Sequence, residues 1–126
     1  MSVEEKPMIA RGQGASPGVA TGKIVFLSAD AVRLAESGES VILVRIETDA
    51  EDMPGIRAAA GIVTTRGGLT SDAAIIARSL GKPCIAGCST MLVSYRDELV
   101  KVTGGAVLQK GQVVTIDGGR GVVYDG

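Results

Sequence analysis

The stretch Gly61–Cys88, GIVTTRGGLTSDAAIIARSLGKPCIAGC, places an apolar run, a glycine-rich loop and a helical pattern in immediate succession. Gly61–Thr64 is apolar enough to predict a buried strand. Ser71–Leu80 predicts the clearest helix of the chain, which the glycine at 81 and the proline at 83 would end. Four apolar residues at the spacing i, i+3, i+4 and i+7 would form its buried stripe: Ala73, Ile76, Ala77 and Leu80.

Short apolar runs separated by glycines surround this stretch and predict further strands. Further strands are expected at Lys23–Leu27, Val41–Arg45, Pro83–Ala86, Leu99–Val102, Ala106–Leu108, Val113–Asp117 and Gly121–Tyr124. Helices are expected over Ala29–Glu36, capped by Ser28, and from a capping box of Thr48 and Glu51 towards Ala59. Strands with a few interspersed helices predict a compact mixed α/β domain. We expect one domain over residues 1–126, with a flexible lead over 1–12.

Composition and charge exclude several classes of function. Thirteen basic and fourteen acidic residues give a net charge of -1 without a basic cluster, and only three residues are aromatic, which argues against nucleic-acid binding. No apolar run is long enough to span a membrane, and the acidic N-terminus lacks the pattern of a signal peptide, so a cytoplasmic location is expected. Cys84 and Cys88 are expected to be free thiols, because neither a metal set nor a disulfide framework surrounds them. No metal site is expected: Asp49, Glu51 and Asp52 are interpreted as solvated acids at a helix start.

The loop that precedes the helix at Ser71 has the features of a phosphate site. Its two glycines let a ligand approach the main chain, and the free N–H groups of a helix N-terminus favour an anion. Arginines supply planar charge, and hydroxyls supply further donors. Taken without any resemblance, these features favour a plain helix start with Asp72 as a favourable first-turn acid, because such helix starts are common. The candidate phosphate-binding residues are Arg66, Gly67, Gly68, Thr70, Ser71 and Arg78.

Four ordered blocks resemble the phosphohistidine (mobile, swivelling) domain of phosphoenolpyruvate-utilising enzymes, and they are most similar to pyruvate phosphate dikinase. The central block is Gly67–Asp72, GGLTSD, which is similar to the Gly-Gly-x-Thr-Ser-His run of that family. The other blocks are GASPGVATG at 14–22, VILVRIETDAEDMPGIRAAAG at 41–61 and GQVVTIDGGRGVVYDG at 111–126. Together they cover nearly the whole chain.

The resemblance implies a swivelling β/β/α fold that moves between a nucleotide-binding domain and a phosphoenolpyruvate-binding barrel. In the family, the histidine of the run carries a phosphoryl group between the two, and a regulatory kinase of plant dikinases phosphorylates the threonine that corresponds to Thr70. No cofactor is expected in this domain, and Mg²⁺ is expected only at the partner domains. Here Asp72 stands at the acceptor position, and the chain contains no histidine.

Aspartate at position 72 leaves several hypotheses. A phosphoryl carrier needs a nucleophile that is partly neutral near pH 7, as imidazole is. The chain is therefore expected to be a carrier domain that is inactive as it stands, either because it is degenerate or because the histidine was replaced. The alternatives are a non-catalytic docking or regulatory module for a phosphoenolpyruvate-using partner, a freestanding small-anion binder, and a carrier that forms an aspartyl phosphate on Asp72.

Overall fold

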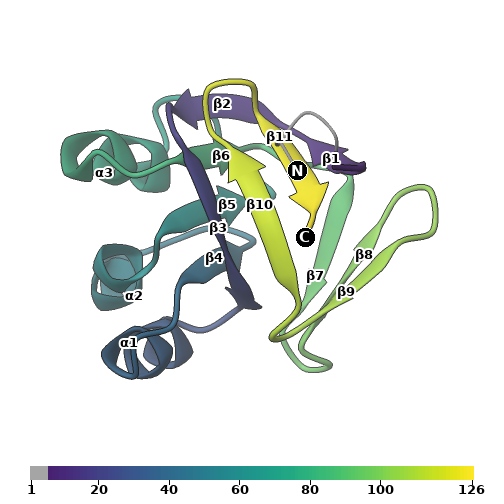
Figure 1. The fold of residues 1–126 in the computed structure, drawn as a ribbon. Helices are drawn as coiled ribbons and strands as arrows, with labels where there is room; N and C mark the ends of the chain where they lie inside the picture. Colours follow the sequence, from purple (N-terminus) through teal and green to yellow (C-terminus); the bar gives the residue numbers. More distant parts are fainter. Residues whose placement is uncertain (1–5) are drawn as a thin grey trace.

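The computed structural model describes residues 6–126, which form short strands, three α-helices and one 3-10 turn (Figure 1). The N-terminal half contains β1 (Met8–Arg11), β2 (Gln13–Ser16), β3 (Val19–Val25), α1 (Ser28–Glu36), β4 (Val41–Arg45), η2 (Ala50–Asp52) and α2 (Met53–Ala58). The C-terminal half contains β5 (Gly61–Thr64), α3 (Asp72–Leu80), β6 (Cys84–Ala86), β7 (Met91–Ser94), β8 (Leu99–Val102), β9 (Val107–Gln109), β10 (Val113–Asp117) and β11 (Val122–Asp125).

The elements form three layers. The central sheet has the order β1-β11-β10-β3-β4-β5-β6-β2, and β3, β4, β5 and β6 run parallel. The helices connect these parallel strands and lie on one side of the sheet, whereas the antiparallel sheet β7-β8-β9 lies on the other side (Figure 1). This arrangement confirms the predicted α/β fold of short strands and a few helices.

Each face of the central sheet buries an aliphatic core. One core lies between the two sheets and includes Phe26, Met91 and Ile116. The other lies between the sheet and the helices and is built largely from alanine, valine and isoleucine, such as Ala74 and Ile62. The small side chains let the helices approach the sheet closely, which suits a chain with so few aromatic residues.

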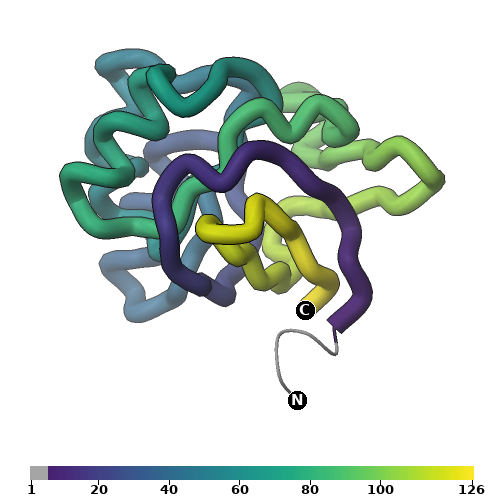
Figure 2. The backbone as a smooth tube through the Cα atoms, turned by 90° about the horizontal axis from the view of Figure 1, so that it is seen from above, coloured from purple at the N-terminus to yellow at the C-terminus, as the bar shows by residue number. Residues whose placement is uncertain are grey.

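The N-terminal segment joins the two ends of the central sheet. β1 pairs with β11 at one edge and β2 pairs with β6 at the other, and only Gly12 separates the two strands. The segment therefore wraps around the sheet, as the purple tube in Figure 2 shows. Met8–Arg11, which fall within the predicted flexible lead, form β1 by pairing with β11, more than a hundred residues away in sequence. Residues 1–5 of that lead lie outside the described residues.

The predicted helix starts need two corrections. Ser28 is the first residue of α1 rather than its cap, and its hydroxyl accepts a hydrogen bond from the Gly55 amide at 2.7 Å. The capping box before α2 is formed by Asp49 and Asp52, not by Thr48 and Glu51. At α1 the N-cap position is Leu27 and no side chain caps the helix, because the Ser28 hydroxyl is used in the tertiary contact with Gly55. Before α2 a capping box forms one position further along the chain than predicted.

The buried stripe of α3 differs from the predicted stripe at one position. Ala73 and Ala77 are buried and Ile76 is partly buried, but Leu80 is exposed and Ala74 is buried in its place. The small alanine side chains fill the core between α3 and the central sheet because the helix lies close to β6. Gly81 ends the helix in the left-handed conformation, with φ 69°, as the sequence predicts.

Strand boundaries follow the predictions where the strand has its own apolar pattern. β4, β5, β8 and β10 have the predicted bounds, and β6, β9 and β11 begin one residue later than expected. β3 occupies Val19–Val25 rather than Lys23–Leu27, because its first residues pair with β10. β7 was not predicted.

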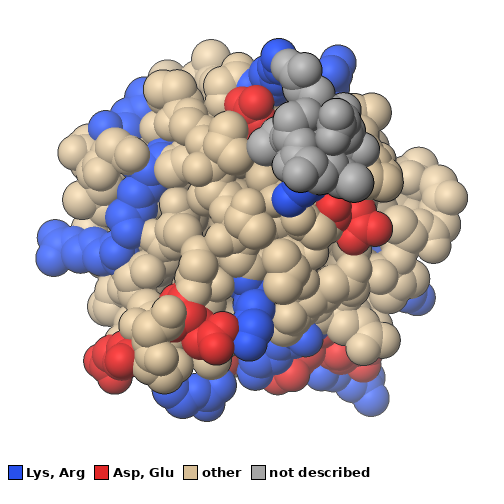
Figure 3. All heavy atoms as spheres, in the orientation of Figure 1, with Lys and Arg blue, Asp and Glu red and all other residues tan. Residues whose placement is uncertain are grey.

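Basic and acidic side chains are interspersed on the face of the molecule that Figure 3 shows. None of the described helices is long and apolar enough to cross a membrane.

Candidate functional site

A cavity of about 300 Å³ lies where the chain leaves the carboxyl ends of β4 and β5 and enters α3. Parallel α/β sheets bind ligands at this end of their strands, because the loops that follow neighbouring strands meet there. The residues that line the cavity come from the segments after both strands and from the first turn of α3: Glu47, Thr48, Thr64, Arg66, Gly67, Thr70, Ser71, Asp72 and Ala73.

Hydrogen bonds within the loop fix its path. The Thr64 hydroxyl donates to the Arg66 carbonyl at 2.9 Å, and the Ser71 hydroxyl donates to the Gly68 carbonyl at 2.8 Å. Gly67 has φ 87°, a conformation that favours glycine. The loop is therefore a turn that is held by hydrogen bonds. Gly67 has a backbone conformation that other residues rarely adopt, as the sequence predicts for a loop that binds phosphate.

The helix start faces this cavity without a side-chain cap. Ser71 is the N-cap residue of α3 in an extended conformation, but its hydroxyl is used within the loop and not by a first-turn amide. The first amides of a helix lack intrahelical acceptors, and together with the helix dipole they favour an anion. Asp72, the first residue of α3, is exposed and places its carboxylate in this first turn.

The charges around the cavity are nearly balanced and slightly acidic. Arg66 is the only basic residue of the lining, whereas Glu47 and Asp72 are both acidic. The Arg66 guanidinium forms an exposed ion pair with Glu47, with Nη1 and Oε1 3.7 Å apart. Such a pair is weak in water, so Arg66 remains available to an incoming anion, while Asp72 opposes one.

The structure brings most of the predicted phosphate-binding residues together. Four of the six line the cavity together with Asp72, the predicted acceptor position, and Gly68 lies beside it within the loop. Arg78 does not line the cavity: its guanidinium donates to the carbonyl oxygens of Ala15, at 2.9 Å, and Leu69, at 2.6 Å. Arg78 thus fastens α3 to β2 and to the loop. The five lining residues are Arg66, Gly67, Thr70, Ser71 and Asp72.

Three lining residues were not predicted from the sequence: Glu47 and Thr48 follow β4, and Ala73 lies in α3. Thr64, which ends β5, begins the loop that is expected to hold the phosphate. The loops after adjacent parallel strands share one edge of the sheet. Applied to the correctly predicted strands at 41–45 and 61–64, that rule would have identified the segment after β4.

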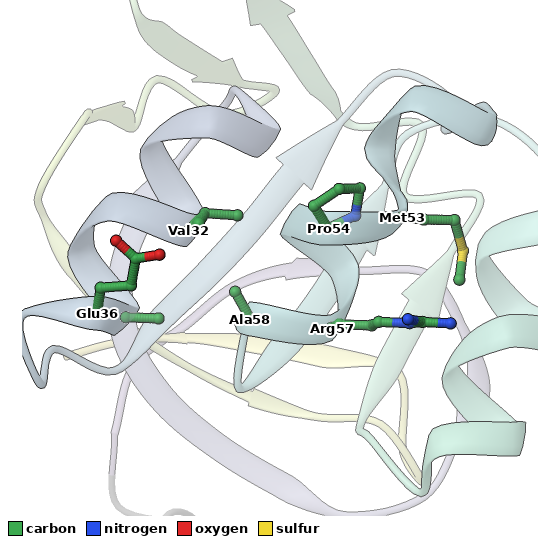
Figure 4. A pocket seen from close by; sticks show the side chains of 7 residues that line it. Val32, Glu36, Met53, Pro54, Arg57 and Ala58 are labelled. Atoms are coloured by element: carbon green, nitrogen blue, oxygen red, sulfur yellow. The ribbon is translucent and has the colours of Figure 1, made fainter.

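A larger cavity, of about 650 Å³, lies between α1 and α2 (Figure 4). Its lining is mainly apolar, with Val32, Met53 and Pro54 beside the charged Glu36 and Arg57. It shares no lining residue with the cavity at α3 and contains no glycine loop. It does contain the start of α2, but there Pro54 has no amide hydrogen and the Gly55 amide already donates to the Ser28 hydroxyl. Polar chemistry therefore favours the smaller cavity as the functional site.

The two cysteines are free, as the sequence predicts, and both are fully buried. Burial raises the pKa of Cys84 to about 12, against a smaller opposing effect of Arg78, and burial raises the pKa of Cys88 to about 11. A protonated, buried thiol is a poor nucleophile and metal ligand. Within residues 6–126, no group of three or more histidine, cysteine or acidic side chains is arranged to hold a metal ion.

Comparison with known proteins places this geometry in a family. The chain is 50% identical over 121 residues to pyruvate, phosphate dikinase of Rhizobium meliloti strain 1021, covering 96% of this chain and 13% of that protein. It is 47% identical over 125 residues to pyruvate, phosphate dikinase 2 of Zea mays, covering 99% of this chain and 14% of that protein. It is 49% identical over 119 residues to pyruvate, phosphate dikinase 2 of Oryza sativa subsp. japonica, covering 94% of this chain and 13% of that protein. The chain thus spans 13% to 14% of the length of these relatives.

A solution structure of Enzyme I is similar to 72% of this chain and 32% of its own, with 27% identity and a TM-score of 0.49. Residues 37–121, which contain β4, β5, α3 and the cavity, match the family described as PEP-utilising enzyme, mobile domain. That match spans more than half of the chain and includes the loop on which the predicted resemblance depends. The chain belongs to the mobile-domain family of phosphoenolpyruvate-utilising enzymes.

Proposed function

We propose that this chain is the phosphoryl-carrier domain of a phosphotransferase of pyruvate phosphate dikinase type, with its acceptor position disabled by Asp72. One observation carries the proposal: Asp72 begins α3 at the mouth of the loop cavity, where the resemblance places the acceptor histidine, and the chain has no histidine. A carrier residue must be accessible to its partners, and Asp72 is exposed.

The surroundings of position 72 support a phosphate ligand. The amides at the start of α3 and the glycine loop suit a phosphoryl group, and the Arg66 guanidinium can form charge-assisted hydrogen bonds to it. Thr70 and Ser71 add hydroxyls at the same cavity. Thr70 is exposed, as the proposed regulatory phosphorylation of this threonine requires.

Asp72 itself opposes the carrier reaction. Its carboxylate repels a phosphoryl donor, and Glu47 lines the same cavity. Aspartyl-phosphate enzymes offset such repulsion with a metal ion bound close to the carboxylate. We place Mg²⁺ only at the partner domains, and we propose that no cofactor binds to this domain.

The partners that this proposal requires are a nucleotide-binding domain and a phosphoenolpyruvate-binding domain. This chain spans 13% of the length of its relative from Rhizobium meliloti, which is therefore about seven times longer. The remaining length of such a relative has room for both partner domains. The second candidate function is a docking or regulatory module for a phosphoenolpyruvate-using partner. The excess of acid at the cavity favours this second candidate, because an acidic carrier site is poorly suited to receive phosphate.

Intact-mass spectrometry tests the proposal. The unmodified domain, the Asp72→His variant and an Asp72→Asn control are each incubated with Mg²⁺, phosphoenolpyruvate and the phosphoenolpyruvate-binding domain of a dikinase. In the expected step an imidazole nitrogen attacks phosphorus, the bond to the enol oxygen breaks, and the released enolate takes a proton to give pyruvate. Only Asp72→His should gain one acid-labile phosphoryl group.

The controls separate the hypotheses. The barrel domain must phosphorylate the mobile domain of its own enzyme in the same assay. If it does so and Asp72→His still gains nothing, the carrier proposal is wrong and the docking module remains. A hydroxylamine-sensitive phosphoryl group on the unmodified domain, absent from Asp72→Asn, would instead make Asp72 a true acceptor.

A further inference from the structure

Tyr95 lies directly after β7, in the three-stranded sheet, yet its hydroxyl reaches the end of β4 in the central sheet. The hydroxyl accepts a hydrogen bond from the Ile46 amide at 2.6 Å, and the ring packs partly buried against the core between the sheets. The Arg45 guanidinium carbon lies 4.5 Å from the ring centroid, within the range of a cation–π contact. One side chain thus contacts two successive residues at the carboxyl end of β4.

Further contacts hold Arg45 in place. Its Nη1 donates to the Phe26 carbonyl at 2.8 Å, and its Nε lies 3.6 Å from Oδ2 of Asp52. The same carboxylate oxygen accepts the Asp49 amide at 3.0 Å in the capping box before α2. The end of β4 is therefore fixed from three directions: by Phe26, which directly follows β3, by the turn before α2, and by Tyr95 from the second sheet.

The end of β4 holds the start of the phosphate loop. The Arg45 carbonyl accepts the Thr65 amide at 3.1 Å, and the Ile46 carbonyl accepts the Arg66 amide at 3.1 Å. Thr65 and Arg66 are the first residues after β5, and Arg66 lines the cavity. A displacement of Ile46 would therefore move the loop that carries the phosphate-binding groups.

We propose that Tyr95 is a positioning residue for the phosphate loop, acting through Ile46 and Arg66. This inference rests on the proposed function, because it treats the loop as the carrier site. Phenylalanine at position 95 keeps a ring beneath Arg45 and removes only the oxygen that accepts the Ile46 amide. The variant Tyr95→Phe thus isolates the hydrogen bond from the packing of the ring.

The test uses Asp72→His as the background, because the chain has no other histidine and only this variant is expected to take up a phosphoryl group. Tyr95→Phe is added to this background, and Tyr124→Phe is the matched control. Tyr124 lies in β11, which β10 and β3 separate from β4. Two quantities are measured: hydrogen exchange of the backbone amides, and the rate of phosphorylation by a dikinase phosphoenolpyruvate-binding domain with Mg²⁺ and phosphoenolpyruvate.

In Tyr95→Phe we expect the amides of Ile46 and Arg66 to exchange about tenfold faster, whereas the Val100 amide in β8 is unchanged. The maximal rate of phosphorylation should fall about tenfold, because a small misplacement of reacting groups is costly. The concentration of barrel domain that gives half this rate should change by less than about twofold, because Tyr95 orients the loop and does not bind the partner. Tyr124→Phe should change none of these quantities.

Two results would overturn the inference. In the first, the Ile46 amide exchanges faster but the Arg66 amide and the phosphorylation rate do not change, so that Tyr95 supports β4 alone. In the second, Tyr124→Phe causes the same losses as Tyr95→Phe. If Asp72→His takes up no phosphoryl group at all, the proposed function fails, and exchange of the Arg66 amide still decides whether Tyr95 positions the loop.

Discussion

Asp72 combines two effects of a single negative charge. In the first turn of α3 its carboxylate interacts favourably with the positive end of the helix dipole. At the same cavity the charge opposes the binding of phosphate. A neutral imidazole at this position would lose the favourable interaction with the helix dipole and would no longer repel phosphate. The stability of the domain therefore favours aspartate at position 72, whereas the proposed carrier function favours histidine.

Replacing Asp72 by asparagine should lower the free energy of unfolding by a few tenths to about 1 kcal/mol, because the interaction with the helix dipole is lost. Urea unfolding of the two proteins at low ionic strength measures the difference, which added salt should reduce. Glu36→Gln is a control of opposite sign, since Glu36 ends α1, where a negative charge is unfavourable. Equal losses in the two variants would contradict the dipole account of Asp72.

At the scale of elements, the turn before α2 depends on Asp52. This side chain is 7% exposed, and its carboxylate both accepts a hydrogen bond from the Asp49 amide and lies beside Arg45. The predicted box placed the same role on Glu51, which is exposed. The two boxes have the same spacing and differ by one position in the chain, so burial and the charge of Arg45 decide between them.

Asp52→Ala should destabilise the protein by about 3 kcal/mol, because it leaves the half-buried charge of Arg45 without its ion-pair partner and removes a capping bond. Glu51→Ala should change stability by less than about 0.5 kcal/mol, since it is an exposed substitution without a capping role. Chemical denaturation of both variants makes the comparison. A larger loss in Glu51→Ala would favour the box predicted from the sequence.

Elements with a local signal could be predicted from the sequence, and elements made by distant pairing could not. Val41–Arg45 and Gly61–Thr64 are continuous apolar runs, which is typical of buried parallel strands, and both have the predicted bounds. β2 contains glycine and polar residues, and β1 is a run of only four residues without an alternating pattern; both become strands because β6 and β11 offer edges to pair with. Tertiary context overrides local propensity for such strands.

The candidate site follows the same division. The loop and helix start at Arg66–Asp72 are contiguous in sequence, so their composition offers a phosphate site beside a plain helix start, and the family resemblance favours the phosphate site. Glu47 comes from the neighbouring strand end, and the contact of Tyr95 with Ile46 comes from the other sheet. Neither contact has a local pattern. Arg78 has the residue type of a phosphate ligand, but two main-chain carbonyls occupy its guanidinium.

At the scale of the whole molecule, Gly12 is the point where the chain passes from one edge of the central sheet to the other. Its amide donates to the Gly121 carbonyl at 2.8 Å. A Cβ atom at this position would lie 2.8 Å from the Ala86 carbonyl oxygen and 2.8 Å from Cγ2 of Ile85. The crossing therefore requires a residue without a side chain.

Gly12→Ala should lower stability by about 1–3 kcal/mol through overpacking, and amides of both β1 and β2 should lose protection. Gly119→Ala is the matched control, because its Cβ would meet only an Asp117 oxygen at 3.5 Å and should cost less than about 0.5 kcal/mol. Thermal unfolding together with hydrogen exchange measures both effects. Unchanged protection of β1 in Gly12→Ala would show that the crossing tolerates a side chain.

The closure of the sheet by the first and last strands also sets the order of events during folding. Met8 pairs with Tyr124, so one rung of the ladder joins residues at nearly opposite ends of the described chain. Contacts of such long sequence separation close late, because a large loop must lose entropy before they form. During synthesis, the ribosome makes Met8–Arg11 long before Val122–Asp125. Met8–Arg11 therefore remains unpaired until the strand with which it pairs has been made.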